Sequence, residues 1–403
     1  MGEWVHNSGK RWLASMLLLL MASTSLSFGQ GKKKKAEPST SASASVSEVG
    51  IDIRKVVWPQ PPNIARIKYL SYFAGEKLPD FNAKSKKKSG WMDRVAGVSP
   101  DQGPSLSNHF FLGEPHGMAV DSKGQLYVSD GKVAAVFIFD PETHDTKMIK
   151  NGKDANFKLI TGLAMDDNDR LFVADSEASH VLVFSANHHA EAVISQGMVN
   201  PVGLAIDVEN RFLYVADPDL DQILVYDADS FALLRSIGTG GKKHTLTTPG
   251  NFAKPTGVAV DPEGNLYVAD MLNARIEIFD ADGNFIRTFG KRGDGPGYFA
   301  MPKGVAIDCD GHIWVSDSMQ NRLQVFTPEG QLLIFVGGAR GLLPGMFSGI
   351  QNVTIDKNNR VFTSEVFPGR VQEFRYVTQA EAAEELHRRE AEKNKSAGKS
   401  PAK

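Results

Sequence analysis

Residues 302–317 read PKGVAIDCDGHIWVSD, and this stretch decides the fold. Residues 305–307 and 313–315 are apolar runs that contain the β-branched and aromatic side chains favoured in strands. Residues 308–311 between them supply a turn, because Asp hydrogen-bonds its own backbone and glycine adopts positive φ without strain. The stretch therefore predicts a β-hairpin with an acidic residue at the end of each strand.

The same pattern occurs six times with small variations. It reads Pro-x-Gly-apolar-Ala-apolar-Asp, where x varies, and a second acid follows. The first acids are Asp121, Asp166, Asp207, Asp261, Asp308 and Asp356, so successive copies are 45, 41, 54, 47 and 48 residues apart. The second acids follow after nine or ten residues, at Asp130, Asp175, Asp217, Asp270, Asp317 and Glu365. The last copy, IQNVTID, is degenerate.

Two further strands complete each copy. A third strand starts shortly after the second acid, as in IEIFD at 276–280, and most copies continue into a fourth, as in NFIRTFG at 284–290. Four strands in a repeat of forty-odd residues are typical of a propeller blade. The sequence therefore predicts an all-β fold, a six-bladed β-propeller of four-stranded blades.

The final copy lacks its outer strand, because the chain runs from Phe374 into a charged tail. Residues 66–73, RIKYLSYF, match the outer-strand pattern and precede the first copy. We therefore expect this N-terminal strand to complete the sixth blade and close the ring, which removes the free sheet edges of a linear array.

The segments outside the repeats have distinct compositions. Lys10 and Arg11 precede an apolar run at 13–21, and Ser27 and Gly29 are small residues before a cleavage point, so residues 1–29 are predicted to be a signal peptide. A retained N-terminal anchor is the alternative. The predicted signal peptide implies export, so we expect the protein outside the cytoplasm, in the periplasm or the extracellular space.

Four parts follow the signal peptide. Residues 30–50 are a basic and Ser-rich spacer with the composition of a disordered segment. The propeller is expected over residues 51–377, with a long insertion at 74–114. Residues 378–403 are a charged helix or disordered tail, in which Thr378 and Glu381 have the spacing of a capping box.

Charge and cysteine content limit the choice of partners. The formal net charge is −2, which gives no general reason to expect nucleic-acid binding. The single cysteine, Cys309, can form no intramolecular disulfide. One basic run in the spacer offers a peripheral contact with an anionic surface, namely Lys32, Lys33, Lys34 and Lys35.

Residues 285–326 and 271–280 resemble the NHL repeat family. The resemblance covers roughly residues 105–376 and the closing strand near 66–73. The long lead-in resembles that of bacterial exported NHL proteins, which are grouped loosely with gluconolactonase-like propellers. The resemblance implies the six-bladed fold but says little about function, because the repeated residues mostly form turns and pack blades together.

The variable residue between Pro and Gly is expected near the central channel in every copy. These residues are His116, Thr161, Val202, Thr256, Lys303 and Gln351. The resemblance implies two metal chemistries for such a channel. The zinc of amidating lyases needs about three ligands, and this ring contains one His. The calcium of lactonases needs six or more oxygen ligands; Asp217, Asp219 and Asp221 are the densest acidic cluster, although a solvated loop is favoured for them.

The second acids are expected to hold the turns of the blades rather than to bind a ligand. Asp270 with Arg275, and Asp317 with Arg322, are five residues apart and are predicted to pair across the turn. We therefore interpret both arginines, together with the acids, as structural.

These patterns favour a non-catalytic binding scaffold outside the cytoplasm that presents one propeller face to a protein, peptide or carbohydrate. No cofactor is predicted. The alternative is a divalent-metal-dependent hydrolase or lyase of gluconolactonase or peptidyl-amidating-lyase type, with calcium or zinc, so enzymatic activity stays open.

Overall fold

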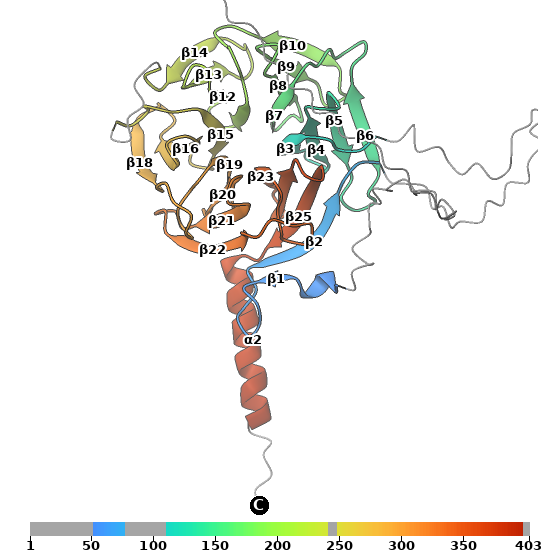
Figure 1. Ribbon diagram of the computed structural model, residues 1–403, viewed down its shortest axis with the longest axis vertical. Helices are drawn as coiled ribbons and strands as arrows, with labels where there is room; N and C mark the ends of the chain where they lie inside the picture. Colours follow the sequence, from blue (N-terminus) through green and yellow to red (C-terminus); the bar gives the residue numbers. More distant parts are fainter. Residues whose placement is uncertain (1–50, 77–109, 241–247, 398–403) are drawn as a thin grey trace, which may run out of the picture. The chain divides into compact units, whose positions relative to one another are not determined.

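The computed structural model describes residues 51–76, 110–240 and 248–397. Antiparallel sheets surround a central channel and form a six-bladed β-propeller (Figure 1). In Figure 1 the strands β3, β7, β15, β19 and β23 lie nearest the centre. The prediction of a six-bladed all-β propeller is confirmed.

The first strand of each blade is innermost. Blade one contains β3 (Pro115–Val120), β4 (Leu126–Asp130), β5 (Ala135–Phe139) and β6 (Thr146–Lys150). Blade two contains β7 (Ile160–Met165), β8 (Leu171–Asp175), β9 (His180–Phe184) and β10 (Ala190–Ile194). Blade three contains β11 (Gly203–Asp207), β12 (Phe212–Asp217), β13 (Gln222–Asp227) and β14 (Leu233–Ile237).

Blades four and five repeat this order. Blade four contains β15 (Pro255–Val260), β16 (Leu266–Asp270), β17 (Arg275–Phe279) and β18 (Phe285–Phe289). Blade five contains β19 (Pro302–Ile307), β20 (Ile313–Asp317), β21 (Arg322–Phe326) and β22 (Leu332–Gly337). Blade six contains β23 (Ile350–Ile355), β24 (Arg360–Glu365) and β25 (Arg370–Tyr376).

The hydrophobic core lies between neighbouring blades. Every residue of β4, β8, β16 and β20 is buried, whereas β18 on the outside contains no buried residue. A middle strand is covered on both faces by the adjacent blades, which explains why its sequence is a continuous apolar run rather than an alternating one. Each blade therefore depends on both neighbours for burial.

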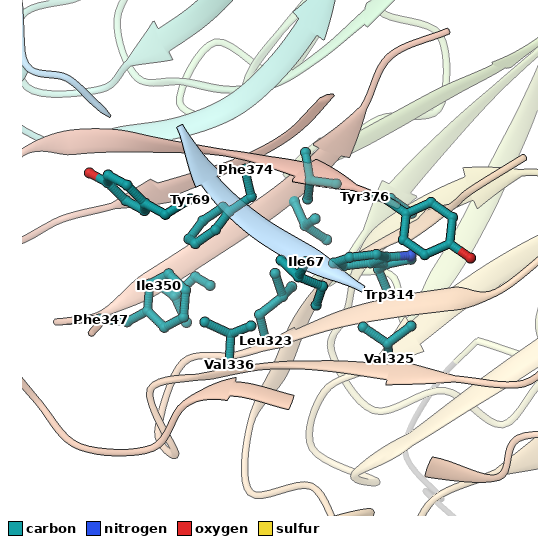
Figure 2. Packing of buried hydrophobic residues seen from close by; sticks show 13 residues of the cluster. Ile67, Tyr69, Trp314, Leu323, Val325, Val336, Phe347, Ile350, Phe374 and Tyr376 are labelled. Carbon is teal, nitrogen blue, oxygen red and sulfur yellow. The ribbon is translucent and has the colours of Figure 1, made fainter. Parts of the chain in front are cut away.

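An N-terminal strand closes the ring, as predicted. Strand β2 (Ile67–Phe73) pairs antiparallel with β25 and completes blade six. Figure 2 shows Ile67 and Tyr69 of this strand packed in one cluster with Trp314, Phe374 and Tyr376. The N-terminal strand and the last two blades are thus joined by a common core.

Blade six has one strand more than predicted. The short strand β1 (Val57–Trp58) pairs with β2, so this sheet is five-stranded. A 3₁₀ turn, η2 (Ile53–Lys55), precedes β1, and Ile53 and Trp58 pack against the closing cluster. The two-residue strand has no alternating pattern of its own, which is why it was not predicted.

Helix α2 (Gln379–Ala397) follows β25. The predicted capping box is present, because the Thr378 N–H donates to Glu381 Oε2 (2.9 Å) and the Glu381 N–H donates to Thr378 Oγ1 (3.2 Å). In the part of the chain that the structure describes, no helix is long and apolar enough to cross a membrane.

The two ends of the predicted insertion at 74–114 lie side by side. Glu76 N–H donates to Phe110 C=O, and Leu112 N–H donates to Ala74 C=O, at 2.9 Å each. The insertion therefore leaves and rejoins the propeller at one place. Residues 77–109 of it lie outside the described residues, as do the predicted signal peptide at 1–29 and the spacer at 30–50.

In the first five copies, the glycine after the variable residue allows the inner strands to approach closely. A Cβ on Gly203 would collide with the carbonyl oxygen of Thr256 in the next blade, and a Cβ on Gly257 would collide with that of Lys303. The conserved spacing of the motif thus reflects backbone packing around the channel.

We expect Gly203→Ala to destabilise the protein by about 1–3 kcal/mol, because an added methyl group must push two inner strands apart. Urea denaturation checks this. Gly152→Ala is the matched control, since its Cβ would meet nothing nearer than 3.8 Å. Equal midpoints for the two variants would contradict the expectation.

Candidate functional site at the channel mouth

In five of the six blades, a backbone bulge in the innermost strand leaves the variable residue without a strand partner. The register between the first and second strands shifts at Pro115/Met118 in blade one and at Pro302/Gly304 in blade five. The same shift occurs in blades two, four and six. A bulge leaves a residue unpaired and redirects its side chain. In blade five the unpaired residue is the variable one, and in blades one, two, four and six the variable residue and the one after it are both without a strand partner.

These side chains line a single cavity of about 350 Å³ at the channel mouth. All of the variable positions contribute to its wall, namely His116, Thr161, Val202, Thr256, Lys303 and Gln351. The sequence placed these residues near the channel, and the structure brings them together. Whether they bind a ligand stays a prediction.

One side of the cavity carries a cation, Lys303, that no carboxylate of the described residues neutralises. Lys303 Nζ donates to Gln351 Oε1 at 2.6 Å, and the Gln351 Nε2 donates to Gly349 C=O at 3.0 Å. Among the residues that the structure describes, Lys303 forms no salt bridge. Burial lowers the pKa of Lys303, because the ammonium group loses hydration that the neutral Gln351 replaces only in part.

Two other polar groups adjoin Lys303. Asn352 Oδ1 accepts a hydrogen bond from the Val353 N–H (2.8 Å), and in the described chain its NH₂ group has no partner. The imidazole of His116, in the next blade, also lacks a hydrogen-bond partner within the described ranges. Burial and then the charge of Lys303 lower the pKa of His116, against the opposing influence of Asp130 and Glu114. Burial and the charge of Lys303 therefore both favour the neutral imidazole.

The opposite side of the cavity is apolar and electrically balanced. Val202, Pro218 and Met271 supply apolar surface. The one charged pair there is Lys254 Nζ with Asp219 Oδ1 at 2.9 Å, and this contact lowers the pKa of Asp219. The cavity thus has a basic half from blades five, six and one, and an apolar half from blades three and four.

Exposed apolar side chains lie in the turns at the same end of the channel as the cavity. Leu272, Met319 and Phe367 occupy the turn after the second strand in blades four, five and six, two residues beyond the second acid. Their exposed fractions are 48%, 64% and 58%. Asp219 holds the equivalent position in blade three and lines the cavity. Sequence reasoning missed this position, although its shift from charged to apolar residues was a readable signal.

The second acids are structural. Asp317 is fully buried and accepts hydrogen bonds from the backbone N–H groups of Ala300, Met301, Met319 and Gln320. Asp317 thereby connects residues 300–301, which lead into β19, with residues 319–320 of the turn after β20. Asp130, Asp175 and Asp217 make the equivalent bonds in blades one to three.

Only one of the predicted arginine pairs forms. Arg275 Nε lies 2.8 Å from Asp270 Oδ2. Arg322 instead donates to the carbonyl of Asp294 and to Gln320 Oε1, at 3.1 Å each, and lies over the ring of Phe335. The reason is that backbone N–H groups already occupy the carboxylate of Asp317.

The three acids of the run at 217–221 each have a different partner. Asp217 is buried against backbone N–H groups, Asp219 pairs with Lys254, and Asp221 accepts from the Lys254 N–H at 2.8 Å. In the described ranges, no three His, Cys, Asp or Glu side chains are grouped to hold a metal ion. Asp217 is buried, so the solvated loop favoured for this run is also incorrect there.

Glu277, in strand β17 of blade four, is a buried carboxyl whose titration is expected to make the stability of the protein depend on pH. Glu277 is fully buried, and burial raises its pKa to about 7 from its ordinary value of 4.5, although Arg275 Nη1 lies 3.3 Å from Glu277 Oε1. Between these values the native state binds more protons than the unfolded state, so stability decreases as pH rises.

We expect the Glu277→Gln variant to lose this decrease. The parent should lose on the order of 1–3 kcal/mol relative to the variant between pH 5 and pH 8, measured by urea denaturation at each pH. Parallel pH profiles for the two proteins would show that Glu277 titrates normally.

Three family models match parts of the chain. The NHL repeat model matches residues 112–139 and 157–184. A model described as the SMP-30/gluconolactonase/LRE-like region matches residues 175–290, and a model described as a 6-bladed beta-propeller matches residues 258–330. The resemblance to NHL repeats that the sequence suggested is confirmed.

Two solved structures share the fold at low identity, and a third is a weaker match. A gluconolactonase from Xanthomonas campestris is 19% identical, with a TM-score of 0.51 over 66% of this chain and 89% of the other. A structural genomics protein of unknown function from Bacteroides thetaiotaomicron is 16% identical, with a TM-score of 0.51 over 66% and 70%. A streptogramin B lyase is 15% identical, with a TM-score of 0.49 over 66% and 85%.

Proposed function

We propose that this chain, a six-bladed propeller with NHL repeats, is a non-catalytic binding protein that takes its ligand at the channel mouth. The observation that carries the proposal is the convergence of the variable side chains of all the blades on one cavity. The repeat holds the fold constant while this one position changes from blade to blade. Such a division of roles is typical of a scaffold that presents a recognition surface.

The alternative is a metal-dependent hydrolase or lyase, which the gluconolactonase-like match at 175–290 motivates. The cavity does not fit the zinc form of that chemistry, whereas the oxygens of Asn200, Asn352 and Asp219 are of the type that calcium accepts. Its wall offers one imidazole, His116, and one carboxylate, Asp219, which Lys254 already binds. A catalytic divalent ion needs about three protein ligands and an open position.

We place this function outside the cytoplasm, because residues 1–29 have the pattern of an export signal. The partner is proposed to be a peptide, protein or carbohydrate of the cell envelope. The basic run at 32–35 would allow a peripheral contact with an anionic surface.

Histidine NMR of the purified protein tests the binding proposal. The probes are N-acetyl dipeptides, short aliphatic acids and their amides, and simple sugars. Because His116 lines the cavity and lacks a partner, at least one probe should shift its resonance, which is assigned with His116→Gln. If every probe leaves the His116 resonance in place, the proposal is wrong.

A metal measurement distinguishes the two functions. We expect purified protein to hold no stoichiometric divalent ion and to melt at the same temperature with and without chelator. A bound ion whose removal lowers Tm would overturn the binding-scaffold proposal in favour of the metal-dependent enzyme.

A further inference from the structure

We propose that the channel ligand carries one carboxylate with an apolar group of several carbons next to it, and that Lys303 binds the carboxylate. This inference rests on the proposed function, since it requires that the channel mouth is the binding site. It follows from the uneven distribution of charge in the cavity, whose basic half faces an apolar half.

The basic half selects an anion. Lys303 contacts only the amide oxygen of Gln351 at 2.6 Å, so its half-buried charge has no counter-ion among the residues described. Asn352 and His116 place further polar groups beside it. A carboxylate there would accept charge-assisted hydrogen bonds and offset the loss of hydration of the ammonium group. A neutral amide of the same shape would leave the cation uncompensated.

The rest of the cavity selects the remainder of the ligand. Asp219 is neutralised by Lys254, so this pair offers no second cation for a dicarboxylate. Val202 and Met271 face the basic half, and the exposed side chains of Leu272, Met319 and Phe367 extend apolar surface around the mouth. A volume of about 350 Å³ is at the lower end of the range of small-molecule sites, roughly 300–1,000 Å³. The ligand is therefore small, with one charge and one apolar end.

Two sources share this chemistry, the C-terminus of an apolar peptide and a short aliphatic acid. Calorimetric titrations with N-acetyl-Leu-Leu and with hexanoate, each compared with its amide, separate them. We expect at least about tenfold tighter binding of the acid than of the amide for one or both pairs. Preference for the dipeptide assigns the site to peptide C-termini, and preference for hexanoate assigns it to small acids.

Variants test the role of Lys303. The Lys303→Gln variant should lose about tenfold or more in affinity for the acid and keep its affinity for the amide within about twofold. Lys123→Gln, an exposed lysine in the turn at the other end of β3, is the matched control and should bind as the parent does. Equal melting temperatures for parent and variants show that the ring is intact.

The outcomes separate this inference from the proposed function. In the parent, a bound carboxylate should raise the pKa of His116, because the anion opposes the charge of Lys303. Amides or sugars that shift the His116 resonance as strongly as the acids would overturn the carboxylate inference while leaving the channel as the binding site. No shift with any probe would overturn both.

Discussion

Deletion of residues 51–73 is expected to destabilise the protein more than any single core substitution. Strand β2 supplies three buried side chains, Ile67, Tyr69 and Phe73, and its loss exposes the edge of β25. Truncation of one large buried side chain typically costs about 2–5 kcal/mol, so the loss of the strand should exceed about 5 kcal/mol. Urea denaturation should show a much lower midpoint or a broad, non-cooperative transition.

Two substitutions in the same strand separate packing from chain length. Ile67 is fully buried whereas the adjacent Lys68 is exposed, because successive residues of a strand point to opposite faces. Ile67→Ala should cost about 2–5 kcal/mol, and Lys68→Ala should remain within about 0.5 kcal/mol of the parent. A deletion variant that melts like the full chain would refute closure by β2.

Asp317→Ala is expected to produce the second large effect, a destabilisation of about 3–5 kcal/mol. The substitution leaves four backbone N–H groups without their acceptor, at a site where Asp317 is fully buried. Each unsatisfied buried donor costs about 1–3 kcal/mol, and partial hydration of the loops reduces the sum. Thermal and urea unfolding measure the loss.

Asp282→Ala is the matched control, since Asp282 is an exposed acid in the turn before β18. Its removal should change stability by less than about 0.5 kcal/mol. Asp317→Asn should be intermediate, because the amide retains one acceptor oxygen. If all three variants unfold together with the parent, the second acids are not structural anchors.

Much of this fold could be predicted because the repeat combines several local signals. Residues 302–317 contain two strands, a turn and both acids, and five other copies confirm the period. The closing strand was predictable for the same reason, since residues 66–73 match an outer strand that blade six lacks. Strand β1 was not, because two residues are too few to show a pattern.

The candidate site was only partly predictable. The position of His116 and Lys303 in the motif predicted that they lie near the channel. It could not predict that Lys303 has no counter-ion among the described residues, because the partner of Lys303 is Gln351 in another blade. The pairing of Arg322 was predicted incorrectly, because equal spacing hides whether backbone donors already fill the carboxylate of Asp317. Contacts between repeats decide such details, and a single repeat does not contain them.

The contact between Arg66 and Tyr376 joins residues 310 positions apart, and it has a consequence for biosynthesis. The ribosome makes β2 before any blade, yet its partner β25 emerges after all the others. The nascent chain must therefore hold an apolar strand without its β25 partner until synthesis of the last repeat is complete, and contacts of such long range slow folding. A chain truncated within the last repeat would lack the β25 partner of β2, so its blades would form an open arc with free strand edges rather than a smaller closed propeller.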